Sequence, residues 1–254
     1  MLYLITGTIQ KTVLIDLLAS AGIIANDVRF HIDENGMHAV ITDTGNVFMG
    51  VVKLDKAAFT NYQFSPSVLC LDVIKTRQVL STIDTDTFDI FMTESSGKLV
   101  VTGGNYVYNS TLIADQVLRK DNQPPVKVMQ NEKTKVTIDA GMLQSTINAI
   151  KNINEDIVKF TCNAKDRVLT ISSDDVTKDN VVVNHKEEPG KMEIVSMEDG
   201  ISRFTISYIG NMARIFSKAK NVTITMAEAF PIRFSFVLDE HISLDYVIAP
   251  RMDD

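Results

Sequence analysis

The sequence predicts an α+β fold made of two tandem copies of one domain. Each half shows the order strand, helix, several strands, helix, several strands. Residues 28–32 (VRFHI) are matched by residues 158–162 (VKFTC) at a constant offset of 130 residues (158 − 28 = 130). A two-fold repeat of this length is a duplicated domain, because solenoids repeat over shorter periods. Halves dominated by strands, with two helices each, place the helices on one face of antiparallel sheets.

The first half begins with a short strand at residues 2–5 and a helix that ends near Ala21. Thr8 is the predicted cap of this helix, and Ile9, Val13 and Leu17 form its apolar side. Asn35-Gly36 suits a tight hairpin between two strands. A second helix fits residues 72–82. The predicted strands are residues 28–32, 37–41, 46–54, 88–92, 98–102 and 106–113.

The second half repeats this order. Asp139 is the predicted cap of a helix that presents Leu143, Ile147 and Ile150 at positions i, i+4 and i+7. A fourth helix begins at Ser207. The predicted strands are residues 135–138, 158–162, 168–171, 181–183, 191–195, 202–206, 222–226, 232–237 and 244–248.

The segment between the halves, residues 115–130, is polar and contains Pro124-Pro125. Two adjacent prolines remove two backbone donors and restrict the residues before them, so neither a helix nor a central strand continues here. The segment reads as an extended connector. The predicted division is an N-terminal domain of residues 1–114, a connector of residues 115–130 and a C-terminal domain of residues 131–254.

Composition bounds the class of protein. The 254 residues carry a net charge of −7, and 45% of them are hydrophobic, which is ordinary for a soluble globular chain. No apolar run reaches the roughly 18 residues that span a bilayer, and the N-terminus has no secretion signal. Cys70 and Cys162 lie in apolar segments, which favours an intracellular protein with two buried thiols. The acidic balance argues against nucleic acid covering the whole surface, but it permits one basic face.

Motifs that would indicate catalysis are absent from the sequence. No phosphate-binding glycine pattern and no nucleophile elbow occurs. The histidines are not spaced as metal ligands, and two distant cysteines make no zinc site. Asp174, Asp175 and Asp179 lack the spacing of a calcium loop. We therefore expect no enzyme, no cofactor and no metal.

The predicted helices lean basic on the face turned away from the sheets, although the chain is acidic. Asp16 is the main acidic residue expected there. Short surface helices often carry lysine, so one interpretation is an ordinary solvated face. The alternative is a segregated basic surface that faces phosphates. The basic residues are Lys11, Lys75, Arg77, Lys151, Arg214, Lys218 and Lys220.

Several stretches closely resemble sliding clamps of the proliferating cell nuclear antigen family, of archaeal or eukaryotic type. They are residues 217–220 (SKAK), 222–226 (VTITM), 230–231 (FP) and the ending 244–254 (LDYVIAPRMDD). Residues 7–11 (GTIQK) resemble the start of that family's first helix, and residues 42–49 (TDTGNVFM) resemble the segment before its central loop strand. The Ala249-Pro250 ending is the most specific of these, and the resemblance in element order covers essentially the full chain.

The resemblance implies a ring of three subunits whose helices line a central hole around duplex DNA. The inner helices of such rings contact phosphates without reading bases. Lys11 and Lys218 correspond to basic channel positions of the family, and the other basic helix residues lie on the same helices. Where the family has further basic residues, this chain has others, which implies a less positive channel: Thr12, Leu18, Gln78, Ser145 and Asn148.

The resemblance also implies a cleft for partner peptides and two edge strands that join subunits. Polymerases, ligases, nucleases and the clamp loader would use short peptides with an aromatic anchor. The matched cleft positions are Asn46, Val47, Met49, Val126, Val128, Pro231, Ala249, Pro250 and Met252. The subunit joint would use residues 106–111 and 177–183, in particular Tyr106, Tyr108, Ser110, Val181, Val182 and Val183. Unpaired edges of this length favour pairing with another chain.

The sequence therefore favours a DNA sliding clamp, a processivity factor for DNA polymerase in replication and repair, which forms a homotrimer. It would act inside the cell with the chromosome, in the cytoplasm or nucleoid of an archaeon or the nucleus of a eukaryote. Two alternatives remain open. One is a subunit of a heterotrimeric checkpoint-type clamp, and the other is a monomeric acidic protein-interaction module.

Overall fold

A computed structural model describes residues 3–93, 97–120, 133–153, 156–174 and 179–251. The chain divides into two compact units, which are described separately. Unit 1 contains residues 1–44, 50–123 and 238–244, and unit 2 contains residues 45–49, 124–237 and 245–254. Within the described ranges, no helix is long and apolar enough to cross a membrane.

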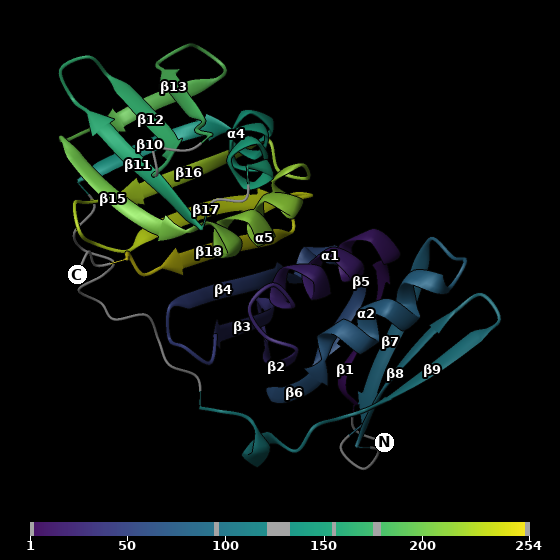
Figure 1. The fold of residues 1–254 in the computed structure, drawn as a ribbon. Helices are drawn as coiled ribbons and strands as arrows, with labels where there is room; N and C mark the ends of the chain where they lie inside the picture. Colours follow the sequence, from purple (N-terminus) through teal and green to yellow (C-terminus); the bar gives the residue numbers. More distant parts are fainter. Residues whose placement is uncertain (1–2, 94–96, 121–132, 154–155, 175–178, 252–254) are drawn as a thin grey trace. The chain divides into compact units, whose positions relative to one another are not determined.

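The first half of the chain, purple to teal in Figure 1, holds two runs of antiparallel strands and two helices. One run has the order β5-β1-β7-β8-β9, and in the other β4, β3, β2 and β6 are successive neighbours. The elements are β1 (Tyr3–Gln10), α1 (Lys11–Ala21), β2 (Asp27–Asp33), β3 (Gly36–Thr42), β4 (Phe48–Asp55), the 3₁₀ turn η1 (Lys56–Ala58), β5 (Phe59–Phe64), β6 (Ser67–Asp72), α2 (Val73–Thr82), β7 (Thr87–Thr93), β8 (Lys98–Gly103), β9 (Tyr106–Thr111) and the 3₁₀ turn η2 (Asp115–Val117).

The second half repeats this plan, with the strand orders β14-β10-β16-β17-β18 and β13-β12-β11-β15. Its elements are β10 (Thr134–Asp139), α4 (Ala140–Asn152), β11 (Ile157–Asn163), β12 (Val168–Ser173), β13 (Val182–Lys186), β14 (Met192–Ser196), β15 (Gly200–Thr205), α5 (Ile206–Phe216), β16 (Asn221–Met226), β17 (Ile232–Leu238) and β18 (Ile242–Ile248).

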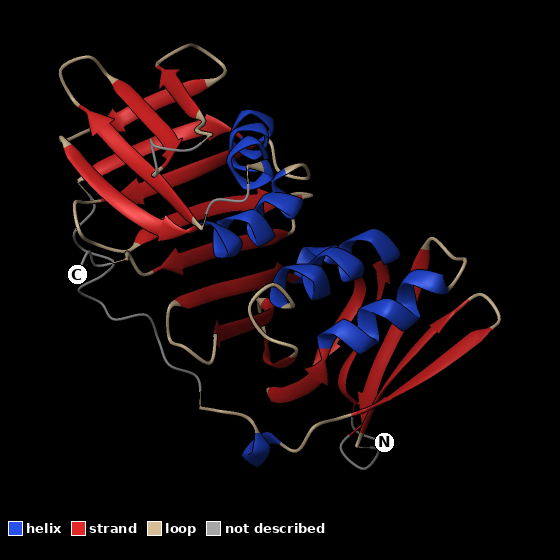
Figure 2. Cartoon of the chain, in the orientation of Figure 1, coloured by secondary structure: helices blue, strands red, loops and turns tan. Residues whose placement is uncertain are grey.

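The helices of each half pack side by side, α1 with α2 and α4 with α5, and both pairs lie against strands (Figure 2). Matching strands bury matching residues. In β2 the side chains of Val28, Phe30 and Ile32 are buried, and in β11 those of Val158, Phe160 and Cys162 take the same places. The predicted α+β fold with an internal repeat is confirmed.

Two local predictions are confirmed, the Asp139 cap and the hairpin at Asn35-Gly36. The Asp139 carboxylate caps α4 by accepting a hydrogen bond from the backbone N–H of Met142 at 2.8 Å. Asp72, which was predicted as the first residue of the second helix, caps α2 in the same way by accepting from the backbone N–H of Lys75 at 2.8 Å. Gly36 closes the β2–β3 hairpin at φ +129°, and a Cβ there would lie 2.1 Å from the carbonyl oxygen of Leu54. Only glycine fits this position.

The predicted cap of the first helix is wrong. β1 extends to Gln10, so Thr8 lies within the strand, and the Thr8 hydroxyl donates to the Asp89 carboxylate of β7. The helix starts at Lys11, and Gln10 before it makes no side-chain cap. Pairing of β1 with both β5 and β7 stabilises the longer strand and outweighs the local helix signal.

Other boundaries also differ from the prediction. Strands β5 and β6 were not predicted. The polar and aromatic residues of β5 do not alternate cleanly, and Asn61 in β5 has φ +58°. β6 (SVLCLD) is a short apolar run directly before α2, which periodicity alone does not distinguish from a helix. The strand predicted at residues 181–183 is β13, residues 182–186, and the fourth helix starts one residue earlier, at Ile206. Both cysteines are buried free thiols, as predicted.

Candidate functional surfaces

The basic residues predicted on the helices are on or next to all four described α-helices. Lys75, Lys151, Arg214, Lys218 and Lys220 are exposed, and Lys11 and Arg77 are half-buried. Lys11 Nζ donates a hydrogen bond to the carbonyl oxygen of Ile83, at the C-terminal end of α2. A cation there interacts favourably with the helix dipole.

The acidic residue expected on the outer helix faces is not there. Asp16 is only 2% exposed, so the prediction that places it on the solvated face of α1 is wrong. The other three described α-helices contain no aspartate or glutamate. Leu18, where the family resemblance implies a basic residue, is also buried. The exposed charge of these helices is therefore entirely positive, on a chain with net charge −7.

The predicted cleft residues that the structure describes all belong to unit 2. Asn46 is exposed, and Val47, Met49, Pro231, Ala249 and Pro250 are half-buried. The backbone N–H of Ala249 donates to the carbonyl oxygen of Val47 at 2.9 Å, so these two segments lie together. Val126, Val128 and Met252 lie outside the described residues.

An aromatic cluster beneath this segment explains why it is held in place. Phe48, which is 1% exposed, packs edge-on against Tyr208 of α5 at 5.5 Å and against Tyr246 of β18 at 5.6 Å between ring centroids. Val47 and Met49 on either side of Phe48 point away from it because side chains alternate along a strand. Neither Phe48 nor Tyr208 was among the residues predicted for the cleft. Phe230, beside Pro231, is also exposed at 38%.

The strands predicted to join subunits are both edge strands within their own units. β9 ends the order β5-β1-β7-β8-β9, and β13 ends the order β13-β12-β11-β15. Tyr106, Val107 and Val182 are more than half exposed, and Tyr108, Val181 and Val183 are half-buried. Ser110 is buried, with its hydroxyl 3.5 Å from that of Thr76. Thr177, the predicted start of the second strand, lies outside the described residues.

The edge strand β13 contains a buried histidine, His185. His185 is 4% exposed, and its Nε2 lies 3.1 Å from the Thr146 hydroxyl of α4. Burial lowers the pKa of His185 below its ordinary value. The neutral ring is therefore the form that the folded strand favours.

The described residues contain no group of three His, Cys, Asp or Glu side chains that could hold a metal ion. His31 and His38 are cross-strand neighbours whose rings stack at 5.1 Å, and His38 Nδ1 lies 3.4 Å from the Asp33 carboxylate. This pair is a local packing contact in the β2–β3 hairpin.

Comparison with known proteins identifies the family of this chain. A family model described as "Proliferating cell nuclear antigen, C-terminal domain" matches residues 116–251, more than half of the chain. Relatives named "DNA polymerase sliding clamp" from Methanocorpusculum labreanum and Methanosphaerula palustris are each 26% identical. Each alignment covers 98% of this chain and 99% of the relative.

Solved structures share the fold over nearly the full length. The structure described as "C-terminal region of FEN-1 bound to A. fulgidus PCNA" superposes with a TM-score of 0.86 at 22% identity. The superposition covers 98% of this chain and 99% of that chain. The Entamoeba histolytica protein also gives 0.86, at 12% identity, over 99% and 100%. The chain belongs to the proliferating cell nuclear antigen family.

Proposed function

We propose that this chain is a DNA sliding clamp, a ring that encircles duplex DNA and tethers DNA polymerase and other replication and repair enzymes. It is a processivity factor that performs no chemistry of its own, and it acts with the chromosome. The observation that carries the proposal is the segregation of charge. The four described helices expose only basic charge, while the chain as a whole is acidic.

This charge distribution suits a surface that slides along DNA. Lysine and arginine at the helix faces attract phosphates whatever the base sequence, and the acidic charge elsewhere prevents DNA from covering the body. The DNA-binding set is Lys11, Lys75, Arg77, Lys151, Arg214, Lys218 and Lys220. Because Lys11 already bonds the end of α2, we assign the exposed cations the larger share of phosphate contact.

Ring closure follows from the two edge strands in this proposal. β9 of one subunit pairs with β13 of the next, and head-to-tail pairing of three copies closes the ring. Exposed Tyr106 and Val182 support this assignment because apolar residues on an unpaired edge favour association. Tyr108, Val181 and Val183 complete the joint, and Ser110, whose side chain is buried, contributes its backbone.

Partner enzymes bind through short peptides in the proposed cleft. Asn46, Val47 and Met49 form one wall, and Pro231, Ala249 and Pro250 form another. Val126, Val128 and Met252 complete the set. The half-buried apolar side chains around the Phe48 cluster suit an aromatic anchor.

We also propose residues 1–114 and 131–254 as the two domains and residues 115–130 as their connector.

Charge reversal on α5 tests the DNA surface. Arg214→Glu with Lys218→Glu should weaken binding to a short duplex, measured by fluorescence anisotropy over a series of salt concentrations. The slope of log affinity against log salt should fall by about 0.9 for each lost phosphate contact. The matched control is Lys53→Glu with Lys56→Glu, an equal charge change at exposed residues outside the four described α-helices. Equal effects of the two pairs would contradict the assignment of the helices to DNA.

A heterotrimeric clamp is the second candidate function, and the sparse channel charge favours it. Thr12, Gln78, Ser145 and Asn148 are exposed and uncharged where the family resemblance implies basic residues. A mixed ring could supply the missing charge from other subunits. Light scattering on the purified chain separates the two, because a mass of three identical subunits would exclude the heterotrimer.

A further inference from the structure

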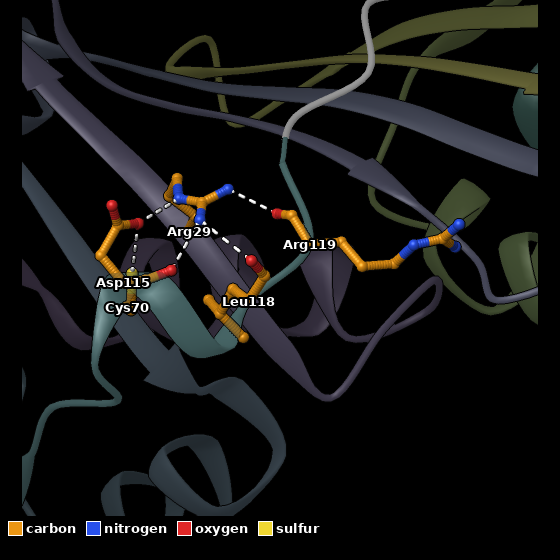
Figure 3. Close-up of polar contacts among 5 residues, drawn as sticks. All are labelled: Arg29, Cys70, Asp115, Leu118 and Arg119. Atoms are coloured by element: carbon orange, nitrogen blue, oxygen red, sulfur yellow. Dashed lines mark hydrogen bonds and ion pairs between the residues drawn. The ribbon is translucent and has the colours of Figure 1, made fainter.

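The Arg29 side chain of β2 binds the first residues of the connector to unit 1 through several hydrogen bonds (Figure 3). Its Nε donates to the Asp115 carboxylate at 2.6 Å. Its two terminal nitrogens donate to the backbone carbonyls of Arg119 at 2.6 Å, Asp115 at 2.9 Å and Leu118 at 3.4 Å. One guanidinium therefore satisfies four acceptors spread over five residues (119 − 115 + 1 = 5).

The strand pairing explains why Arg29 points at the connector. Val28 and Phe30 on either side of it face the core, so Arg29 faces the opposite side of β2. Its partner across the strands is Cys70 of β6, which therefore lies on the same face. Asp115 covers both residues, with its carboxylate 3.8 Å from the Cys70 sulfur. Arg29 is left only 10% exposed and Cys70 only 4%.

Hydrogen bonds hold this segment to unit 1. The turn η2 has three residues, too few to be stable alone. Its Val117 side chain is 74% exposed. A cavity of about 480 Å³ lies between residues 117–120 and the start of β2 and end of β3. Nothing in this arrangement replaces the guanidinium fork, because lysine has no planar set of donors.

The contacts continue from the connector to a loop of the proposed cleft. The Arg119 guanidinium lies 3.4 Å from the carbonyl oxygen of Asp43, just after β3. Asn46 and Val47 follow Asp43 in the chain. The position of Arg119 therefore bears on the loop that leads to these two cleft residues.

We propose that Arg29 is a positioning residue for partner capture: by latching residues 115–119 onto β2 and β6, it places Arg119 against Asp43, in the loop that leads to the cleft residues Asn46 and Val47. This inference rests on the proposed function, since it takes the cleft as the site of partner binding. Loss of the latch releases residues 115–119 and the contact with Asp43, so this loop must be ordered when a peptide binds and the affinity falls with the fraction of competent chains.

Cys70 reports directly on the latch, and Cys162 in unit 2 is an internal control. Burial, and after it the Asp115 charge, raises the pKa of Cys70 to about 11. Release of the segment exposes the thiol and lowers its pKa. Because the thiolate is the reactive form, Arg29→Gln should raise the rate of Cys70 labelling by N-ethylmaleimide at least about tenfold. Labelling of Cys162 should not change, and Arg29→Lys should fall between.

The matched control is Arg167→Gln. It removes another arginine fork, which belongs to unit 2 and in which Arg167 bonds Glu187 at 2.7 and 2.8 Å. It should leave the Cys70 rate unchanged. Circular dichroism checks that each variant folds, and Arg29→Lys carries the test if Arg29→Gln does not. An unchanged Cys70 rate in a folded Arg29 variant would overturn the latch.

Affinity is measured by calorimetry with a synthetic peptide of the C-terminal region of FEN-1, the segment described as bound to A. fulgidus PCNA. Arg29→Gln should weaken binding about tenfold, and Arg167→Gln should not change it. Faster Cys70 labelling with unchanged peptide affinity would overturn the positioning role. No binding by the unaltered chain would instead contradict partner capture, and the labelling rates would still decide whether the latch exists.

Discussion

Protonation of His185 should destabilise the β13 edge, and the effect has a defined sign and upper limit. The ring is 4% exposed and shares a hydrogen bond with Thr146 of α4. Burial lowers its pKa in the folded chain below the ordinary value of about 6.5. Below that pH the unfolded chain binds more protons than the folded chain, so the free energy of unfolding falls as the pH falls.

The magnitude follows from the linkage of one proton to unfolding. The loss cannot exceed about 1.4 kcal/mol for each pH unit below about 6.5, and it stops once the pH passes the lowered pKa. Above about pH 7.5 His185 is neutral in both the folded and the unfolded chain, so this loss of unfolding free energy does not occur. His185→Gln keeps a neutral hydrogen-bonding side chain beside Thr146 and removes the titration.

Urea unfolding of the unaltered chain and of His185→Gln, at pH 7.5, 6.5 and 5.5 and at one protein concentration, isolates this term. As the pH falls, the unfolding free energy of the unaltered chain should decrease more than that of His185→Gln. His241→Gln, at the turn between β17 and β18, controls for the substitution itself. Parallel pH profiles for the unaltered chain and His185→Gln would refute the reasoning.

Three further predictions concern assembly, partners and folding. Val182→Arg should split the assembly into folded monomers, seen as a lower mass by light scattering, because the joint would bury an unpaired charge; an unchanged mass would place the joint elsewhere. Met49→Glu should weaken binding of the FEN-1 peptide in calorimetry without lowering the unfolding free energy, and equal affinity would remove Met49 from the cleft. Asp139→Ala should cost about 1 kcal/mol in urea unfolding, since the α4 cap is lost, and no change would mean that the cap adds nothing.

The internal repeat and most of the local structural features could be predicted from the sequence. The alternating apolar residues of β2 and β11 predict strands that the structure contains, and Asp139 before α4 predicts its cap. These features depend on neighbours in the chain, so a local pattern is sufficient. The same logic fails at Thr8, where pairing with strands far along the chain extends β1 through the predicted helix start.

The surfaces were harder to predict for the same physical reason. Asp16 has the sequence position of an exposed helix residue, but it is buried in the packed structure. Arg29 looks like an ordinary polar residue on the outer face of a strand. Its contacts with Asp115 and Arg119 join residues about ninety positions apart, which no local pattern encodes. The charge of the helices, in contrast, could be read from the sequence because it depends on composition alone.

Retention on closed circular DNA tests most directly whether this protein encircles DNA. The protein is loaded onto a nicked circle by a cognate loader, washed at a salt concentration that abolishes binding to short duplexes, and followed before and after the circle is cut. A ring is held by its topology, so it should stay on the circle and leave once the DNA is linear. Phosphate contacts alone weaken steeply with salt and do not distinguish the two forms. Loss at equal rates from circular and linear DNA would contradict the sliding clamp.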